Sequence, residues 1–398
     1  MRRRLLQTTL AVGALALLAT TGTVVASAKR ASADEYKVGI VYSRTGLLAA
    51  YGAEYIQGLR YGIQYATGGT NNVNGKSITL SLADDKTDPS TGVSAVKDLI
   101  GQGYKIIAGA TSSGVALQEA PIAAQNQVLF ISGPAASDAI TGLNRYTFRS
   151  GRQTYQDVAT AATYLPKGAG KNVLVFAQDS AFGQGNFAAV KAIVGGKGHN
   201  VSSLYVPLSA TDFTPFAQQA KQAKPDVLYV AWAGATATQV WAALDQQGVF
   251  STVDNVVTGL AERVTYPSYG PAISKMHFLS HYQYQAPSNK VNDWLKAQMR
   301  KKSQFPDLFT PDGFVAGQMI VQALKKGDYD VDKMISALEG WKFLAPKGWQ
   351  AIRPQDHAML QPMFRISLSQ TGKVWTTKLL GTASSYETAP PIVSAFQS

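Results

Sequence analysis

Apolar runs rich in β-branched residues alternate with segments of helical period along most of this chain. We predict strands at 37–42, 78–82, 104–108, 128–132, 172–177, 201–207, 226–231, 256–259 and 276–284. We predict helices at 53–66, 91–101, 113–126, 155–165, 185–195, 215–223, 235–247, 291–302, 312–325 and 331–339. Continuous apolar strands that alternate with helices are typical of parallel sheets covered on both faces. The pattern therefore indicates an α/β protein, and 398 residues are enough for two such lobes of similar size.

Turn signals add two hairpins and one helix cap to this pattern. Asn74 and Gly75 tolerate positive φ and predict a hairpin turn, and 369–373 joins two further strands at 363–368 and 374–378. Asp88 precedes a helix and is expected to cap it.

The first 33 residues have the pattern of a secretory signal peptide. A basic start at 2–4 leads into an almost wholly apolar run at 5–19, which is short for a membrane span. Two Ala-Ser-Ala cleavage sites follow, ending at Ala28 and Ala33. We therefore expect export, and the pattern leaves open both the cleavage site and the route, Sec or twin-arginine.

Charge and cysteine content narrow the compartment and the partners. The formal net charge of +12 falls to +7 without the first 33 residues, which hold five Lys or Arg and no acid. The other basic residues are scattered, which argues against binding to nucleic acid. The sequence has no cysteine, so neither disulfides nor the lipid-bearing cysteine of a lipoprotein is possible. We expect a periplasmic or extracellular protein without a lipid anchor.

Two strand-to-turn patterns in the first half of the chain point to a binding site. The strand at 104–108 leads into a turn at 109–113, and the strand at 128–132 leads into a turn at 133–137. Both turns precede predicted helix starts, where unpaired N–H groups and a partial positive charge attract anions. Ligands of open α/β sheets bind at the carboxyl ends of the strands. We predict a carboxylate site formed by residues of these turns: Ser112, Ser113, Ala135, Ala136 and Ser137.

Aromatic residues follow three other predicted strands. Tyr51 lies beyond the first strand, Phe182 follows the strand at 172–177, and Trp232 ends the strand at 226–231. Aromatic walls at the carboxyl ends of strands are typical of a ligand cleft, and such rings can also hold an ammonium group.

Catalytic and metal sites have weaker support. Ala110-Thr-Ser-Ser-Gly114 is one residue away from the nucleophile elbow of hydrolases, so an exported hydrolase using Ser112 or Ser113 stays an alternative. A hydrolase also needs a histidine base held by an acid, and of the four histidines His277 and His281 share one face of a predicted strand with no carboxylate between or beside them. The chain also lacks cysteine and the spacing of a metal motif. We expect no enzymatic activity, cofactor or metal.

Several segments together resemble the leucine/isoleucine/valine-binding type of extracytoplasmic solute-binding protein, the receptor part of a branched-chain amino acid ABC importer. The segments include Lys37-Val-Gly-Ile-Val-Tyr-Ser-Arg-Thr-Gly46, Tyr51-Gly52, Gly109-Ala-Thr-Ser-Ser-Gly-Val-Ala-Leu117, Ile131-Ser-Gly-Pro-Ala-Ala-Ser137, Phe148-Arg149 and Asp179-Ser-Ala-Phe-Gly-Gln-Gly185. Further segments are 211–213, 224–226 and 352–357. The resemblance spans nearly all of the chain after the first 33 residues.

The resemblance implies a two-lobed clamshell, the periplasmic-binding-protein fold, with three hinge crossings. Lobe 1 would comprise 36–154 and 281–344, and lobe 2 would comprise 155–280 and 345–398. Ser113, Ala135 and Ser137 would bind the ligand carboxylate, and Tyr51, Phe182 and Trp232 would line the cleft. The solute, a branched-chain or other amino acid, would be passed to an ABC permease by a monomer.

The ligand ammonium is where the chain departs from the family. The family usually places an acid shortly after the strand that corresponds to 256–259, and only Glu262 could serve here, with its register shifted. If Glu262 faces away from the cleft, an aromatic or aliphatic carboxylate, or an amide, is the better ligand. A ligand-sensing module of a receptor is a further alternative, because it uses the same clamshell.

Overall fold

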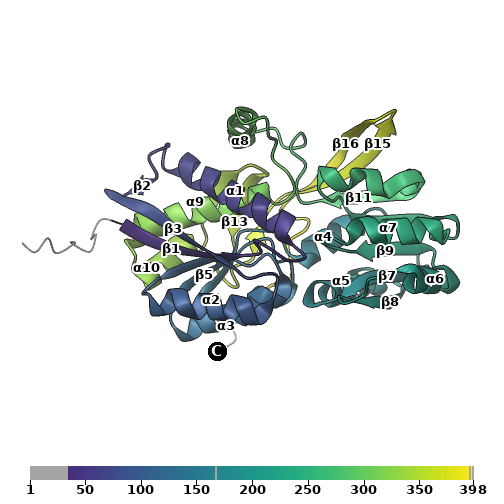
Figure 1. Ribbon diagram of the computed structural model, residues 1–398, viewed down its shortest axis with the longest axis horizontal. Coiled ribbons are helices and arrows are strands. Elements are labelled where there is room, and N and C mark those ends of the chain that lie inside the picture. Colours follow the sequence, from purple (N-terminus) through teal and green to yellow (C-terminus); the bar gives the residue numbers. More distant parts are fainter. Residues whose placement is uncertain (1–34, 166–167, 394–395, 397–398) are drawn as a thin grey trace, which may run out of the picture. The chain divides into compact units, whose positions relative to one another are not determined.

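The computed structural model describes residues 35–165, 168–393 and 396, and the predicted signal peptide at 1–33 lies outside this part of the chain. Its main sheets consist mostly of parallel strands with helices on both faces, as predicted (Figure 1). Within the described residues, no helix combines the length and the apolar character that crossing a membrane requires.

A six-stranded sheet and its helices form the first lobe. The strand order is β2(Asn72–Val73), β3(Lys76–Asp84), β1(Glu35–Tyr42), β4(Ile106–Gly109), β5(Leu129–Ser132) and β6(Thr147–Arg149). Only β2 is antiparallel to its neighbour in this sheet. One face carries α1(Ala49–Ala66), α9(Thr310–Gly327) and α10(Val331–Leu338), and the other carries α2(Pro89–Gly101) and α3(Ser113–Gln125). Because side chains alternate along a strand, Ile40 enters the core under α1 and Val41 enters the core under α2.

A seven-stranded sheet and its helices form the second lobe. The strand order is β16(Val374–Ala383), β15(Met363–Thr371), β11(Met276–Ser280), β10(Asn255–Gly259), β9(Val227–Ala231), β7(Asn172–Asp179) and β8(Asn200–Pro207). The hairpin β15–β16 is antiparallel, and the other five strands are parallel. One face carries α4(Thr154–Ala161) and α5(Ala181–Ile193), and the other carries α6(Thr214–Ala223), α7(Ala237–Gln246) and the 3-10 segment η4(Arg263–Lys275).

The segment between α8 and the last hairpin belongs to the first lobe. Helix α8(Lys290–Arg300) packs against Tyr61 and Phe314, which lie on α1 and α9. The small sheet of β12(Lys342–Ala345), β13(Gly348–Ile352) and β14(Met359–Leu360) follows. Ile352 and Met359 are buried in the core shared by β1, α1 and α9. The return to the second sheet therefore comes between β14 and β15, and not at 344–345 where we expected it, because these apolar side chains join the first core.

Most predicted elements are present, with shifts of a few residues at their ends. The hairpin turn at Asn74 and Gly75 is confirmed by the β2–β3 pairing, and the Asp88 carboxylate accepts a bond from the Thr91 amide at 2.8 Å, as a helix cap does. The helix expected after residue 137 is only one 3-10 turn, η1(Asp138–Ile140). The strands β2, β6 and β12 to β14 are too short to give a readable pattern in the sequence.

The strand order of each lobe determines where a ligand can bind. In the first sheet the chain moves from β1 to β3 on one side and then to β4 on the other, and in the second sheet β7 has β8 and β9 on its two sides. Such reversals open a crevice at the carboxyl ends of the flanking strands. The loops after β1, β4, β7 and β9 are therefore the expected positions of a site.

Candidate functional site

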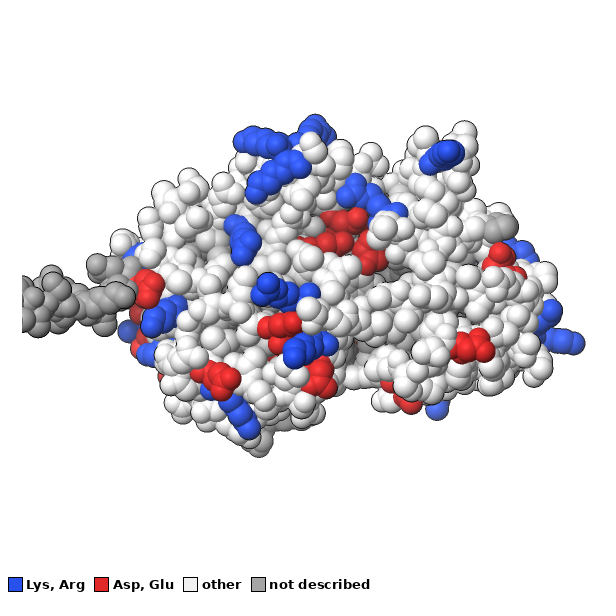
Figure 2. All heavy atoms as spheres, in the orientation of Figure 1, with Lys and Arg blue, Asp and Glu red and all other residues white. Residues whose placement is uncertain are grey.

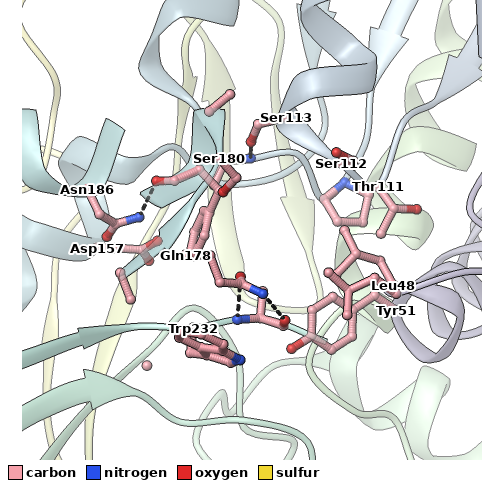
Figure 3. A pocket seen from close by; sticks show the side chains of 18 of the residues that line it. Leu48, Tyr51, Thr111, Ser112, Ser113, Asp157, Gln178, Ser180, Asn186 and Trp232 are labelled. Carbon is pink, nitrogen blue, oxygen red and sulfur yellow. Dashed lines mark hydrogen bonds between the residues drawn. The ribbon is translucent and has the colours of Figure 1, made fainter. Parts of the chain in front are cut away.

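A cavity of about 440 Å³ is lined by loops from both lobes. Its walls include residues after β1, β4 and β5 in the first lobe and after β7, β9 and β10 in the second. In Figure 3, Tyr51, Thr111 and Ser112 lie on one side of this space, and Gln178, Asn186 and Trp232 lie on the other. A volume of this size is within the range of small-molecule sites.

The start of α3 forms the polar wall contributed by the first lobe. Thr111, Ser112, Ser113 and Gly114 all line the cavity. The first helical turn has no acceptors for its leading amides, and the Ser112 side chain makes no capping bond. Gly109, with φ +133°, allows the strand to end close to β1, because a Cβ there would lie 1.8 Å from the Val41 carbonyl oxygen. The predicted anion-binding helix start is thus present and open to the cavity.

The second predicted turn supports the first turn and contributes less to the cavity wall. Ser113 Oγ accepts hydrogen bonds from the amides of Ala136 and Ser137, each at 3.1 Å. Of the three residues predicted in this turn, Ala136 lines the cavity, and Ala135 and Ser137 do not. Arg149 donates to the carbonyl oxygens of Ala135 and Ser137, and it fixes their backbone. Ala135 and Ser137 are thus outside the cavity lining: the Ser137 amide donates to Ser113 Oγ and the Ala135 amide donates to the Ala110 carbonyl oxygen, and their contact with a ligand stays a prediction.

Aromatic rings form the apolar walls, as the sequence indicated. Tyr51, Phe182 and Trp232 all line the cavity. Trp232 packs against Phe213 and Phe176 with ring centroids 5.5 and 5.8 Å away, respectively. Phe309 is an additional wall, and its ring lies 4.4 Å from that of Tyr51.

Polar groups on the wall of the second lobe bond mainly to one another. Gln178 exchanges two hydrogen bonds with the backbone of Ala233, at 3.0 and 3.1 Å. Asn186 donates to the Phe182 carbonyl oxygen at 2.9 Å and accepts from the Tyr229 hydroxyl at 3.0 Å. Since these donors and acceptors are occupied, the wall presents chiefly apolar surface to a ligand.

Charge in the cavity wall is limited to a few side chains. Lys86 and Arg152 are the cations, and Asp157 is the one carboxylate among the described residues that line the cavity. Arg152 Nε donates to Asp157 Oδ2 at 3.1 Å, and both side chains are buried. Burial raises the pKa of the Asp157 carboxyl, and the Arg152 guanidinium opposes this shift. The lining therefore has one positive charge in excess, if His281 is neutral.

His281 also lines the cavity and is neutral at pH 7. Burial lowers its pKa well below the usual value, and the positive charges of Arg152 and Lys347 act in the same direction. Its Nε2 lies 4.0 Å from Asp312 Oδ2, and neither atom has a hydrogen-bond partner. Lys347 donates to the other oxygen of Asp312 at 2.7 Å.

Glu262 does not line the cavity. It follows β10 and is buried, and the Thr265 hydroxyl lies 3.5 Å from its Oε2. The neighbouring Leu260 and Ala261 do line the cavity, so the loop reaches the site and the carboxylate points elsewhere. The predicted role of Glu262 as a direct partner of a ligand ammonium therefore has no support in this geometry.

Direct contacts join the two lobes beside the cavity. The Gly234 amide donates to the Tyr51 hydroxyl at 3.0 Å, and the Ala235 amide donates to the Leu47 carbonyl oxygen at 3.0 Å. Gly234 has φ +84°, and a Cβ there would lie 2.4 Å from the Leu47 oxygen. The structure therefore represents the two lobes closed over the cavity.

Sequence reasoning missed two kinds of lining residue. Phe309 lies between α8 and α9, far from any strand end. Arg152, Asp157 and His281 come from the segments that cross between the lobes, where no motif marks them. The signal that could have found Asp157 is an acid in the first turn of a buried helix next to a predicted hinge.

The described residues offer no metal site and no catalytic hydroxyl. No group of three or more His, Cys, Asp or Glu within 35–165, 168–393 and 396 is arranged to hold a metal ion. In the same part of the chain, Ser113 Oγ bonds with backbone amides, and no hydrogen bond links Ser112 or Ser113 to an imidazole. A serine nucleophile needs such a base.

Comparisons with known proteins show which family the chain resembles. A family model described as periplasmic binding protein matches residues 35–373. The Leu/Ile/Val-binding protein BraC3 of Rhizobium johnstonii is 32% identical over 219 residues, which are 52% of this chain and 58% of that protein. The chain thus spans somewhat more than half the length of this curated relative.

Solved structures match over a larger part of the chain. An ABC-type branched-chain amino acid transporter protein from Rhodopseudomonas palustris is 31% identical, has a TM-score of 0.74, and aligns over 90% of this chain and 99% of its own. A solute-binding protein from another R. palustris strain, in complex with 3,4-dihydroxybenzoic acid, is 26% identical with a TM-score of 0.79 and coverage of 88% and 98%. The matches confirm the two-lobed fold, the resemblance identified from the sequence, and a binding protein instead of an enzyme.

Proposed function

Because this chain belongs to the periplasmic binding protein family, we propose that it captures a small carboxylate-bearing solute between its lobes and delivers it to an ABC transporter permease. It would act as a monomer in the periplasm or outside the cell, after export by the signal peptide at 1–33. The cavity is the part of the molecule that selects the solute.

One observation carries the proposal: an open helix start faces a cavity between the lobes whose lining has excess positive charge. The leading amides of α3 and the hydroxyl of Ser113 point to the same space as Lys86. Ser113 Oγ accepts two amide bonds, so its own hydrogen is free to be donated to a ligand oxygen. Amides and hydroxyls at a helix start favour a carboxylate.

The rest of the cavity favours a solute without an ammonium group. A zwitterionic amino acid needs an acid or free carbonyl oxygens near its α-nitrogen, and the Asp157 carboxylate is already paired with Arg152. Glu262 lies outside the lining. Tyr51, Phe182 and Trp232, with Phe309, suit a planar or branched apolar body. We therefore favour an aromatic or aliphatic carboxylate over an α-amino acid, in line with the aromatic acid bound by one structural neighbour.

Capture would proceed by hinge closure. The carboxylate docks first on the start of α3, because that wall belongs to one lobe and needs no closure. Closing then brings Trp232 and Phe182 against the solute and forms the bond from the Gly234 amide to Tyr51. Contacts that exist only in the closed form shift the population toward it.

Matched solute pairs test this proposal. Isothermal calorimetry and thermal shift should compare 3-phenylpropanoate with phenylalanine, and 4-methylpentanoate with leucine, because each pair differs only in the ammonium group. Benzoate and benzamide form a third pair, which differs in the carboxylate charge. We expect the acids without ammonium to bind more tightly than the amino acids, and benzoate more tightly than benzamide, since a ligand of the folded state raises its stability.

The outcomes separate the parts of the proposal. Tighter binding of phenylalanine and leucine than of their partners would favour the amino-acid alternative. Equal binding of benzoate and benzamide would refute the carboxylate site at α3. Delivery is tested separately, by solute-dependent stimulation of the permease ATPase in proteoliposomes, and a lack of stimulation by the loaded protein would favour the sensing alternative.

A further inference from the structure

A group of charged side chains joins the two lobes next to the cavity, and we call Glu54, Glu262, Arg263 and Asp307 the seam cluster. Glu54 lies on α1 and Asp307 precedes α9, so both belong to the first lobe. Glu262 and Arg263 follow β10 in the second lobe. Figure 2 shows acidic side chains gathered between the lobes, with basic side chains beside them.

Hydrogen bonds hold the seam cluster in place. Arg263 Nε and its backbone amide donate to Asp307 Oδ2 at 3.0 and 3.3 Å. Arg263 also donates to the Phe305 carbonyl oxygen at 3.2 Å. Glu54 Oε2 accepts from the Phe309 amide at 2.8 Å. Phe309 lines the cavity, and Arg263 follows a loop that lines it. Because Arg263 and Asp307 belong to different lobes, the seam cluster assembles only when the lobes close.

The seam cluster contains three carboxyl groups and one guanidinium. Only Asp307 bonds to Arg263, so Glu54 and Glu262 have no cation of their own within the cluster. Glu262 is 7% exposed. Two carboxylates held near a third, with one cation among them, cannot all stay ionised without a large electrostatic cost.

We propose that closing the lobes takes up a proton at the seam cluster, on Glu262, so that solute capture is linked to proton binding. The idea rests on the proposed function, since closure is the event that captures the solute. In the open form Glu262 leaves Asp307 and Glu54 and regains water, and it ionises as an ordinary carboxyl does. In the closed form burial and the nearby Asp307 carboxylate favour the protonated form of the same carboxyl.

The pKa shifts of Glu262 and Glu54 agree with this geometry. Burial raises the pKa of Glu262 to about 7, and the Asp307 carboxylate adds to this effect. Burial, followed by the charge of Asp307 and then that of Glu262, raises the pKa of Glu54 well above its usual value, and Arg263 opposes this shift.

Every element around Glu262 contributes to its environment. Glu54 and Tyr51 face it from α1, Asp307 faces it from the segment before α9, and Tyr269 faces it from η4. Arg263 is the cation of this group, and it is already bonded to Asp307.

The direction of the pH effect follows from these shifts. A carboxyl whose pKa is higher in the closed form stabilises closure at low pH, and this contribution is lost as pH rises through about 7. With an ordinary open-state value, the closing constant should fall up to about tenfold per pH unit between about pH 5 and 7, and then level off.

The absence of cysteine allows a direct test without any solute. Gln102→Cys in the first lobe and Gln219→Cys in the second, both exposed and uncharged, provide positions for a fluorescent donor and acceptor. Energy transfer in the unliganded protein should report a closed population that rises as pH falls from 8 to 5. Glu262→Gln, which mimics the protonated carboxyl, should flatten the titration and keep the population near its low-pH value.

A control and a second readout complete the experiment. Asp332→Asn, which removes an exposed carboxylate paired with Arg145 far from the seam, should leave the titration unchanged. Calorimetry with 3-phenylpropanoate at pH 6 in phosphate and bis-Tris buffers should give different heats, because the buffer supplies the proton that is taken up, and Glu262→Gln should abolish the difference. A flat energy-transfer titration, or an unchanged slope in Glu262→Gln, overturns the proposal. If 3-phenylpropanoate gives no heat, the proposed ligand class fails. The energy-transfer titration without solute still shows whether closing the lobes takes up a proton.

Discussion

Replacing Ser113 by alanine tests the central element of the site. Its hydroxyl oxygen accepts two buried amide bonds at 3.1 Å, from Ala136 and Ser137. Each bond contributes about 0.5–1.5 kcal/mol, so Ser113→Ala should lower the free energy of unfolding by about 1–3 kcal/mol. The hydroxyl hydrogen donated to a carboxylate contributes about 1.5–3 kcal/mol more in the complex, so the Kd should rise about 10- to 150-fold.

Ser112→Ala is the matched control for stability, because this residue lies at the same helix start and its side chain makes no capping bond. Urea denaturation would give the free energies of unfolding, and calorimetry with the tightest acid of the solute panel would give Kd. We expect Ser112→Ala to unfold as the wild type does. Equal stability of the two variants would refute the role of Ser113 as a bridge between the two turns. Wild-type affinity in Ser113→Ala would refute a hydrogen bond from Ser113 to the solute.

Other substitutions probe the walls, the lobe contact and a buried ion pair. Trp232→Ala removes an aromatic wall and should weaken binding of aromatic acids by on the order of 2 kcal/mol, measured by calorimetry; an unchanged Kd would contradict its contact with the solute. Gly234→Ala places a Cβ near the Leu47 oxygen when the lobes are closed, so Kd should rise about tenfold or more, or about 1.4 kcal/mol; the φ of +84° strains an alanine in either form, so Tm should fall as well. Lys347→Met leaves Asp312 buried without its cation and should cost about 3–5 kcal/mol of stability; adding Asp312→Asn should restore part of it, and no recovery would count against the ion pair.

Local patterns in the sequence are enough to predict the two main sheets and part of the cavity lining. Apolar runs locate β1, β4, β5, β7 and β9, because strands buried on both faces need continuous apolar residues. The residues that follow those strands, among them Ser113, Phe182 and Trp232, line the cavity because strand ends in such sheets converge on a crevice.

The remaining site residues depend on tertiary contacts. Phe309 reaches the cavity because α1 and α9 pack together, and no local motif encodes this contact. Ser137 follows the expected pattern, yet its amide bonds to the Ser113 side chain. Glu262 is near the expected register, but its side chain is buried outside the cavity lining, with the Thr265 hydroxyl 3.5 Å from its Oε2. A pattern predicts position along the chain, and packing decides which way each side chain points.

Closure depends in part on groups that no solute touches. The amide of Ala235 and the carbonyl oxygen of Leu47 belong to the main chain, and the hydrogen bond between them links the halves whatever side chains surround the cavity. Exchanging Phe182, Trp232 or Phe309 should therefore alter the preferred acid and leave the closing motion intact. Such independence makes the molecule a practical starting point for fluorescent sensors, in which specificity is redesigned and the optical signal is retained.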